Sequence, residues 1–148
     1  MHTKQYVAGF MFNPIDSFEF VQRVALVKKN RPEWQAGKFN GIGGKIELGE
    51  APAYAMAREF EEETGCVTKP EDWFKFCTLM GDGFKVYFYY TFGNHRLLRS
   101  VTDEEIVSIP VPEITVDNAI PNLLYLIPMA LNRAFERDRA SSFTVTEN

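Results

Sequence analysis

Runs of β-branched and aromatic residues, separated by turn-forming residues, recur along the chain and predict strands. They are YVAGFMF at 6–12, FVQRVALVKK at 20–29, WFKFCTLM at 73–80, FKVYFYYTF at 84–92 and EIVSIPVPEI at 105–114. The turn-like NPIDS separates the first two runs, which therefore predict a hairpin or neighbouring strands. GDG separates the third run from the fourth and is a strong hairpin signal.

Two other segments have the features of helices. Residues 52–64 begin with a proline in the first turn, are rich in alanine and methionine, and precede Gly65 where a C-terminal cap would lie. Residues 120–139 place leucine and isoleucine on one stripe at positions 123, 126, 127 and 131. The glycine-rich stretch 30–52 predicts a loop with a short strand, and the polar tail 140–148 predicts a frayed end. We therefore predict one α/β domain over residues 1–148.

Composition excludes several classes of function. A chain of 148 residues with 45% hydrophobic content suits one compact domain, and a net charge of −4 disfavours a binder of duplex nucleic acid. Cys66 and Cys77 have no zinc spacing and do not suggest a disulfide framework. No apolar run approaches the roughly 18 residues of a membrane span, and no export signal is present. The sequence predicts a cytoplasmic protein without membrane contact.

An acidic stripe on the first predicted helix is the main candidate for chemistry. Glu59, Glu62 and Glu63 stand at i, i+3 and i+4, so their carboxylates share one face and repel each other. Carboxylates near a helix C-terminus also oppose the helix dipole. A hard cation such as Mg²⁺ would relieve the repulsion, because it prefers carboxylate oxygens together with substrate phosphates. The alternative is a solvated helix face, which is what such a run in isolation more often represents.

The spacing around these glutamates favours the metal site. From Gly44 the chain runs five residues to Glu50, seven more to Arg58-Glu59-Phe60, one to Glu62-Glu63 and one to Gly65. This resembles the Nudix box, G-x5-E-x7-R-E-U-x-E-E-x-G-U, with U an apolar residue. A chance match has a probability on the order of 10⁻⁸ per start position. Cys66 is a mild departure at the last apolar position. The resemblance covers residues 43–66 directly and, more weakly, residues 6–134.

Membership of that family would imply the fold and the activity. The fold would be an α/β/α sandwich with a mixed β-sheet. The activity would be Mg²⁺- or Mn²⁺-dependent hydrolysis of nucleoside diphosphates linked to another moiety. By resemblance, Glu59, Glu62, Glu63 and the carbonyl of Gly43 are metal ligands, and Arg58 orients the glutamates. The expected partner is a nucleotide substrate, and a homodimer is possible.

The resemblance also assigns supporting and catalytic roles. Glu50 would support the loop, and Gly44 and Gly65 would permit tight backbone between loop and helix. Catalysis would involve Glu62, Glu63 and Arg58. It would also involve a downstream acid from VTDEEIVSIP, where the candidates are Asp103, Glu104 and Glu105. We favour Glu105 and read Asp103 as a solvated loop residue.

The segment KKNRPEWQAGKFNGIGGKIE is similar to that of oxidised-purine nucleoside triphosphate diphosphatases. The similarity implies that Asn40 contacts the base and that Lys28 lies near the substrate. Near IPNLLYLIP, Ile120, Asn122 and Leu123 stand where those enzymes have a stacking tryptophan and two recognition aspartates. Only Asn122 retains a polar contact there, so we expect weak discrimination of 8-oxoguanine. The strand aromatics Phe39, Tyr87 and Tyr89 are candidates for base stacking or for the core.

Two classes of function follow. The first is a metal-dependent pyrophosphohydrolase acting on an NTP or dNTP, a dinucleotide or a nucleotide sugar. The second is a non-catalytic, Nudix-shaped module that senses a nucleotide. Because loss of a box glutamate would favour the sensor and every box glutamate is present, the sequence favours the enzyme.

Overall fold

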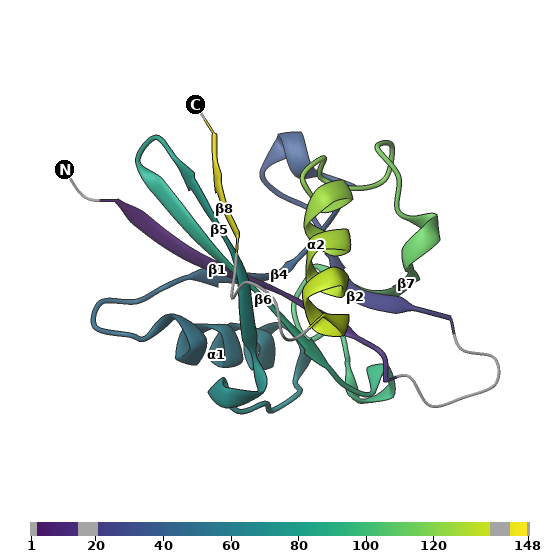
Figure 1. Ribbon diagram of the computed structural model, residues 1–148. Coiled ribbons are helices and arrows are strands. Elements are labelled where there is room, and N and C mark those ends of the chain that lie inside the picture. Colours follow the sequence, from purple (N-terminus) through teal and green to yellow (C-terminus); the bar gives the residue numbers. More distant parts are fainter. Residues whose placement is uncertain (1–2, 15–20, 137–142, 148) are drawn as a thin grey trace.

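The computed structural model of the protein describes residues 3–14, 21–136 and 143–147. These residues form a mixed eight-stranded sheet flanked by two helices (Figure 1). The strands are β1 Lys4–Phe12, β2 Arg23–Lys28, β3 Phe39–Asn40, β4 Ile42–Lys45, β5 Phe74–Gly81, β6 Phe84–Phe92, β7 Glu105–Pro110 and β8 Phe143–Thr146. The helices are α1 Pro52–Thr64 and α2 Leu123–Phe135, with 3₁₀ turns η1 Glu33–Gln35, η2 Pro70–Asp72, η3 His95–Leu97 and η4 Val111–Glu113.

Strand β1 is the centre of the sheet. Its whole length runs parallel to β6, from Lys4 beside Phe84 to Phe12 beside Phe92. Its other edge is shared, because the first half pairs with β4 and the last residues pair with β2, both antiparallel. The path continues as β3-β2-β1-β6-β5-β8, with β7 against β2. The predicted strand pairs, including the β5–β6 hairpin, are confirmed.

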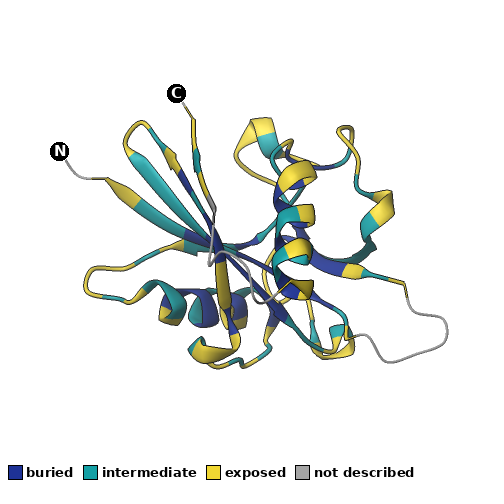
Figure 2. Ribbon diagram, viewed as in Figure 1, coloured by how far each residue is buried: buried dark blue, intermediate teal, exposed yellow. Residues whose placement is uncertain are grey.

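Alternation of side chains along β1 divides the core into two layers. Phe10 and Phe12 pack in the cluster that contains the buried residues of α2, whereas Val7 and Met11 pack with the buried residues of α1. Each helix therefore covers one face of the sheet, and buried residues line both sides of it (Figure 2). The predicted α/β/α sandwich with a mixed sheet is confirmed.

Helix α1 begins and ends at the predicted residues. Its cap, Gly65, has φ 74°, a left-handed conformation that favours glycine, and its backbone N–H donates to the Glu61 carbonyl at 2.8 Å. Met56 and Phe60 are fully buried against the sheet, and Phe60 meets the Trp73 ring edge to face at 5.0 Å between centroids. The apolar stripe thus fixes which face of α1 turns outward with the glutamates.

The C-terminal tail differs from its prediction. We expected residues 140–148 to fray, but β8 pairs in parallel with β5, with Val145 beside Leu79. The backbone N–H of Glu147 then donates to the Met80 carbonyl at 2.7 Å. The segment Phe143–Thr146 is an aromatic and β-branched run, which favours a strand, and Val145 packs against the core cluster that contains α2. Residues 140–142 and 148 lie outside the described residues, as do 15–17 of the first predicted turn and 137–139 of the predicted closing helix.

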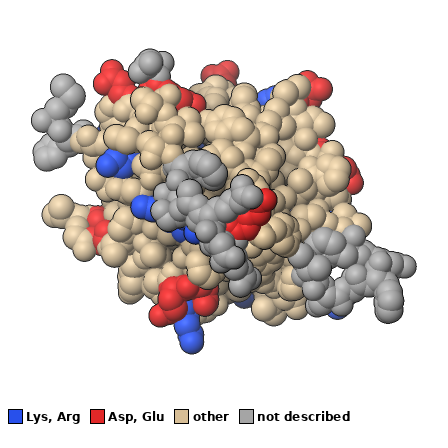
Figure 3. Space-filling view, viewed as in Figure 1, with Lys and Arg blue, Asp and Glu red and all other residues tan. Residues whose placement is uncertain are grey.

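Other expectations from composition concern the surface and the thiols. Cys66 and Cys77 are both free. No helix among the described residues is long and apolar enough to cross a membrane. Acidic and basic side chains are interspersed over the face shown in Figure 3. Residence in the cytoplasm and the possible homodimer stay predictions.

Truncating the side chain under α1 tests its packing. We expect Phe60→Ala to lower the free energy of unfolding by roughly 3–5 kcal/mol, because it empties a fully buried site and removes the contact with Trp73. Tyr54→Ala, on the exposed side of the same helix, should change it by less than about 0.5 kcal/mol. Chemical denaturation measures both, and a loss for Phe60→Ala no larger than that of Tyr54→Ala would contradict the packing.

Candidate active site

Arg58 lies at the centre of the acidic face, the side of α1 that carries Glu59, Glu62 and Glu63. Its guanidinium donates to both carboxylate oxygens of Glu50, at 2.6 and 2.8 Å, and to the Lys45 carbonyl at 3.1 Å. The same side chain donates to Glu59 at 3.0 Å and to Glu62 at 3.2 Å. The Arg58 guanidinium holds the pKa of the Glu50 carboxyl below its usual value. Arg58 therefore ties the loop after β4 to α1 and gathers the glutamates beside it.

Glu59 is the carboxylate that presses on β4. A Cβ atom built on Gly44 would lie 2.4 Å from the Glu59 carboxyl carbon, so a side chain at this position would displace the carboxylate. A Cβ on the adjacent Gly43 would lie only 1.9 Å from the Val7 carbonyl oxygen of β1. Burial raises the pKa of Glu59, which the neighbouring Arg58 partly offsets. The two glycines thus let β4 lie flat between β1 and the acidic face.

Glu63 faces a different neighbour, the segment that precedes β7. Thr102 Oγ1 donates to the Glu63 carboxylate at 3.4 Å, and the Arg99 backbone N–H donates to the Thr64 carbonyl at 3.0 Å. Burial, and then the negative charge of Glu104, raises the pKa of Glu63. The structure therefore brings Glu104, distant in sequence, next to the acidic face.

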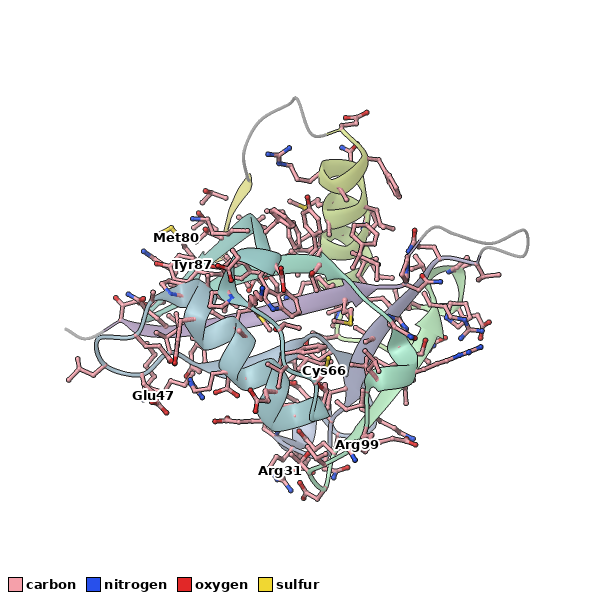
Figure 4. All side chains as sticks on the ribbon, turned by 90° about the horizontal axis from the view of Figure 1, so that it is seen from below. Arg31, Glu47, Cys66, Met80, Tyr87 and Arg99 are labelled. Carbon is pink, nitrogen blue, oxygen red and sulfur yellow. The ribbon has the colours of Figure 1, made fainter. Side chains whose placement is uncertain are left out.

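Glu104 is almost fully buried, with 6% of its surface exposed. Its carboxylate accepts from Lys29 Nζ at 2.9 Å and from the Asn30 backbone N–H at 2.6 Å. Burial opposes the charged form, but these two donors outweigh it and hold the pKa of Glu104 below its usual value. An ion pair between Arg31 and Asp103 joins the same two segments, and Figure 4 labels Arg31 and Arg99 at this end of the molecule.

The structure distinguishes the two adjacent glutamates that are candidates for the downstream acid, Glu104 and Glu105. Glu105 is exposed at the start of β7, where it pairs with the exposed Lys28 of β2. Glu104 lies in the bend just before β7 and is buried, whereas Glu105 is the first residue of the strand and is exposed. The geometry favours Glu104 over Glu105, and the sequence offered no signal to separate two adjacent glutamates.

Glu61 and Glu62 complete the helix face. Glu61 is exposed, as its helical position predicts, and Glu62 is 57% exposed while it contacts Arg58. Among the described residues, no three His, Cys, Asp or Glu side chains converge closely enough to hold a metal ion. The donor chemistry nevertheless fits a hard divalent cation, because Glu59 and Glu63 are carboxylates whose pKa values burial raises, and a bound cation would favour their charged forms.

A cavity of about 560 Å³ opens on the other side of β4. This volume lies within the range typical of small-molecule sites. The cavity is lined by Lys29, Trp34, Asn40, Gly43, Gly44, Phe88, Ile120, Asn122 and Glu147, among others. Gly43 and Gly44 line the cavity while Gly44 also contacts Glu59, so one short strand separates the cavity from the acidic face.

Of the binding residues predicted from the sequence, Asn40 and Asn122 line the cavity and Lys28 does not. Asn40 lines the cavity, and its amide donates to Gln35 at 3.0 Å while its oxygen accepts from the Gly41 N–H at 2.8 Å. Asn122 lines it too, at the start of α2. The lysine in the cavity wall is Lys29, and the exposed Lys28 lies beyond that wall. Lys28 is the last residue of β2 and pairs with Glu105, whereas Lys29 follows the strand and its ammonium binds Glu104.

Other candidates divide between pocket and core. Ile120 is buried in the cavity wall, and Leu123 is buried under α2. Tyr89 packs in the cluster beneath α1, with Tyr87 against it, and burial raises the pKa of Tyr89 to about 12. These tyrosines belong to the α1 side of the sheet, opposite the cavity.

Comparison with known proteins adds three findings. The sequence model of a family described as NUDIX domain matches residues 3–122. A NUDIX domain of NrtR from Shewanella oneidensis, in complex with ADP ribose, superposes with a TM-score of 0.72 at 18% identity, covering 90% of each chain. A MutT NUDIX hydrolase from Burkholderia pseudomallei gives 0.65 at 18% identity, covering 84% of this chain and 95% of that one.

A curated relative matches over a much shorter stretch. An octanoyltransferase from Myxococcus xanthus is 54% identical over 43 residues, which are 29% of this chain and 12% of that protein. The chain thus spans only about an eighth of that relative. The similarity is local and carries no octanoyl transfer to this chain.

Metal binding to the acidic face is testable by thermal unfolding. Mn²⁺ at ten times its dissociation constant should raise the free energy of unfolding by about 1.4 kcal/mol relative to chelator, because the cation offsets repulsion in the folded state. Glu62→Gln should reduce this gain, and Glu61→Gln should preserve it because Glu61 is exposed beside that face. Equal midpoints with Mn²⁺ and chelator, together with no heat in calorimetry, would refute the site.

Proposed function

The chain belongs to the Nudix family, and we propose that it is a metal-dependent pyrophosphohydrolase. Its substrates would be nucleoside diphosphates linked to another moiety: an NTP or dNTP, oxidised or not, a dinucleotide or a nucleotide sugar. The products would be a nucleoside phosphate and a second phosphate-containing product. The proposed partner is the nucleotide substrate, and the proposed reaction involves neither duplex nucleic acid nor a membrane.

The observation that carries the proposal is the meeting of cavity and acidic face at Gly44. One side of this residue lines the cavity, and the other leaves no room for a Cβ atom beside the Glu59 carboxylate. Lys29 makes a second connection, because it lines the cavity and its ammonium binds Glu104. A nucleotide whose base occupies the cavity could extend its phosphates toward the carboxylates.

The carboxylates would hold the cation that this reaction needs. Glu59, Glu62 and Glu63, with the carbonyl of Gly43, supply the oxygen donors that Mg²⁺ or Mn²⁺ prefers. Such a cation, when bound, would neutralise the diphosphate oxygens and make the attacking water more acidic.

Residues of this chain would do the remaining work. Arg58 positions Glu59 and Glu62 through its hydrogen bonds to both. A carboxylate oxygen of Glu63, which faces Thr102, would accept the proton of the attacking water. Glu104, in place of Glu105, would be the downstream acid, because its buried charge stands beside Glu63.

The second candidate is a nucleotide sensor that does not turn over its ligand. One observation favours it: the structurally similar NUDIX domain of NrtR is in complex with ADP ribose. The intact set of box glutamates favours the enzyme. Release of phosphate or nucleotide from dNTPs, dinucleotides and ADP-ribose, measured with Mg²⁺ and with chelator, separates the two, since a sensor binds in this panel without releasing product.

The helix phase of the glutamates predicts a sharp contrast between neighbours. Glu62→Gln and Glu63→Gln should each lower kcat by at least ~10²-fold, since each removes a charge needed in the transition state. Glu61→Gln should be nearly silent because its side chain points away from that face. Steady-state kinetics measure this, and equal damage from Glu61→Gln would invalidate the assignment of the face.

A second pair of neighbours tests the downstream acid. Glu104→Gln should lower kcat by about 10–100-fold, the usual effect of changing a partner that supports metal ligands. Glu105→Gln should stay within about twofold of wild type because this side chain is exposed. Thermal midpoints serve as the folding control. A larger loss in Glu105→Gln than in Glu104→Gln would restore the role to Glu105.

A further inference from the structure

The cavity wall contains two residues that the sequence motifs did not single out, Trp34 and Glu147. Trp34 lies in η1 and is 66% exposed at the cavity, with Pro32 and Gln35 beside it in the wall. Gln35 is held by Asn40, whose amide donates to it at 3.0 Å. An indole left largely in water beside a cavity presents a flat aromatic face on which a base can stack, a contact that all bases can make.

Asn122 contributes an unused hydrogen-bond acceptor. Its side-chain oxygen Oδ1 is buried and has no hydrogen-bond partner among the residues that the structure describes. A buried acceptor without a donor is costly, and native structures rarely retain one without reason. Because Asn122 lines the cavity, a ligand in the cavity can supply the missing donor.

Glu147 brings a second acceptor to the same cavity from the far end of the chain. Its backbone N–H donates to the Met80 carbonyl, which anchors the residue at the end of β8. Glu147 and Asn122 line the same cavity, and burial, followed by the charge of Glu147, raises the pKa of Tyr125 in the first turn of α2. Asn122 caps that turn, and the Tyr125 N–H donates to its carbonyl at 3.2 Å. Glu147 therefore brings a carboxylate, anchored at the end of β8, to the cavity that Asn122 lines at the start of α2.

We propose that Trp34, Asn122 and Glu147 form the nucleobase subsite of this cavity and select a base that presents two neighbouring N–H donors. This inference rests on the proposed function. Guanine meets the requirement, because its ring N–H and exocyclic amino group are adjacent. Adenine and cytosine offer one amino group beside a ring nitrogen lone pair, which the carboxylate would repel. Thymine and uracil offer one N–H between two carbonyl oxygens.

The subsite also has a consequence for oxidised bases. The edge that carries the two donors is the same in guanine and in 8-oxoguanine, and Asn122 and Glu147 would read that edge. The subsite therefore selects for guanine without separating the oxidised from the normal base. This agrees with the weak discrimination expected from the residues at 120, 122 and 123.

The test compares wild type, Glu147→Gln and Trp34→Ala on the four dNTPs and on GMP, AMP, CMP and UMP without metal. Wild type should prefer dGTP by about tenfold or more in kcat/KM, and Glu147→Gln should reduce that preference by about 10–100-fold or abolish it. Trp34→Ala should raise KM for all four dNTPs by about 10–100-fold, and Trp34→Phe should restore most of the affinity. Glu113→Gln, which removes an exposed acid outside the cavity wall, is the matched control for charge.

The outcomes separate this inference from the proposed function. Hydrolysis of all dNTPs without a guanine preference, or a preference that Glu147→Gln leaves unchanged, overturns the subsite and leaves the hydrolase standing. Binding of GMP in preference to the other monophosphates, lost in Glu147→Gln, supports the subsite even if no nucleotide is hydrolysed, and in that case only the proposed hydrolase fails. If Glu113→Gln lost the guanine preference to the same extent as Glu147→Gln, the cause would be the change in net charge, and the subsite would be overturned.

Discussion

The site depends on one interaction, the hydrogen bonding of Arg58 to the glutamates around it. Carboxylates on one helix face repel each other, and near the C-terminal end they also oppose the helix dipole. Arg58 donates to Glu50, Glu59 and Glu62, and its guanidinium also donates to the Lys45 carbonyl, which closes the loop against the helix. These hydrogen bonds offset the repulsion among the carboxylates of the acidic face. They also hold β4 in place beside the cavity.

Close packing around β4 is the second constraint, and it makes cavity and acidic face neighbours. Gly43 approaches the backbone of β1, and Gly44 approaches the carboxylate of Glu59. A Cβ atom at Gly43 would meet the backbone of β1, so glycine is required there, whereas a Cβ atom at Gly44 would push the Glu59 carboxylate aside. In the proposed enzyme, β4 has no side chains at Gly43 and Gly44. One ligand can therefore place its base in the cavity and its phosphates beside the glutamates.

The proposed subsite draws on segments far apart in the chain. Trp34 follows β2, Asn122 begins α2 and Glu147 follows β8. Asn122 and Glu147 lie at the ends of regular elements and Trp34 lies in the short turn η1, all in connecting segments that the scaffold positions. A cavity assembled in this way can change its preference for a base without change to the acidic face, which is built almost entirely from α1.

Local spacing in the sequence determined the bounds of α1, the pairing of β1 with β2 and of β5 with β6, and the sharing of one helix face by Glu59, Glu62 and Glu63, because these follow from hydrophobic periodicity, turn residues and a motif within 23 residues of Gly43. Tertiary structure decided the rest. Glu104 and Glu105 are alike in sequence, and only the pairing of β7 and the contact with Lys29 separate them. The run Phe-Thr-Val-Thr at 143–146 favours a strand locally, but the open edge of β5 decided where that strand pairs. Long-range pairing of this kind depends on the partner segment, so it cannot be read from either segment alone.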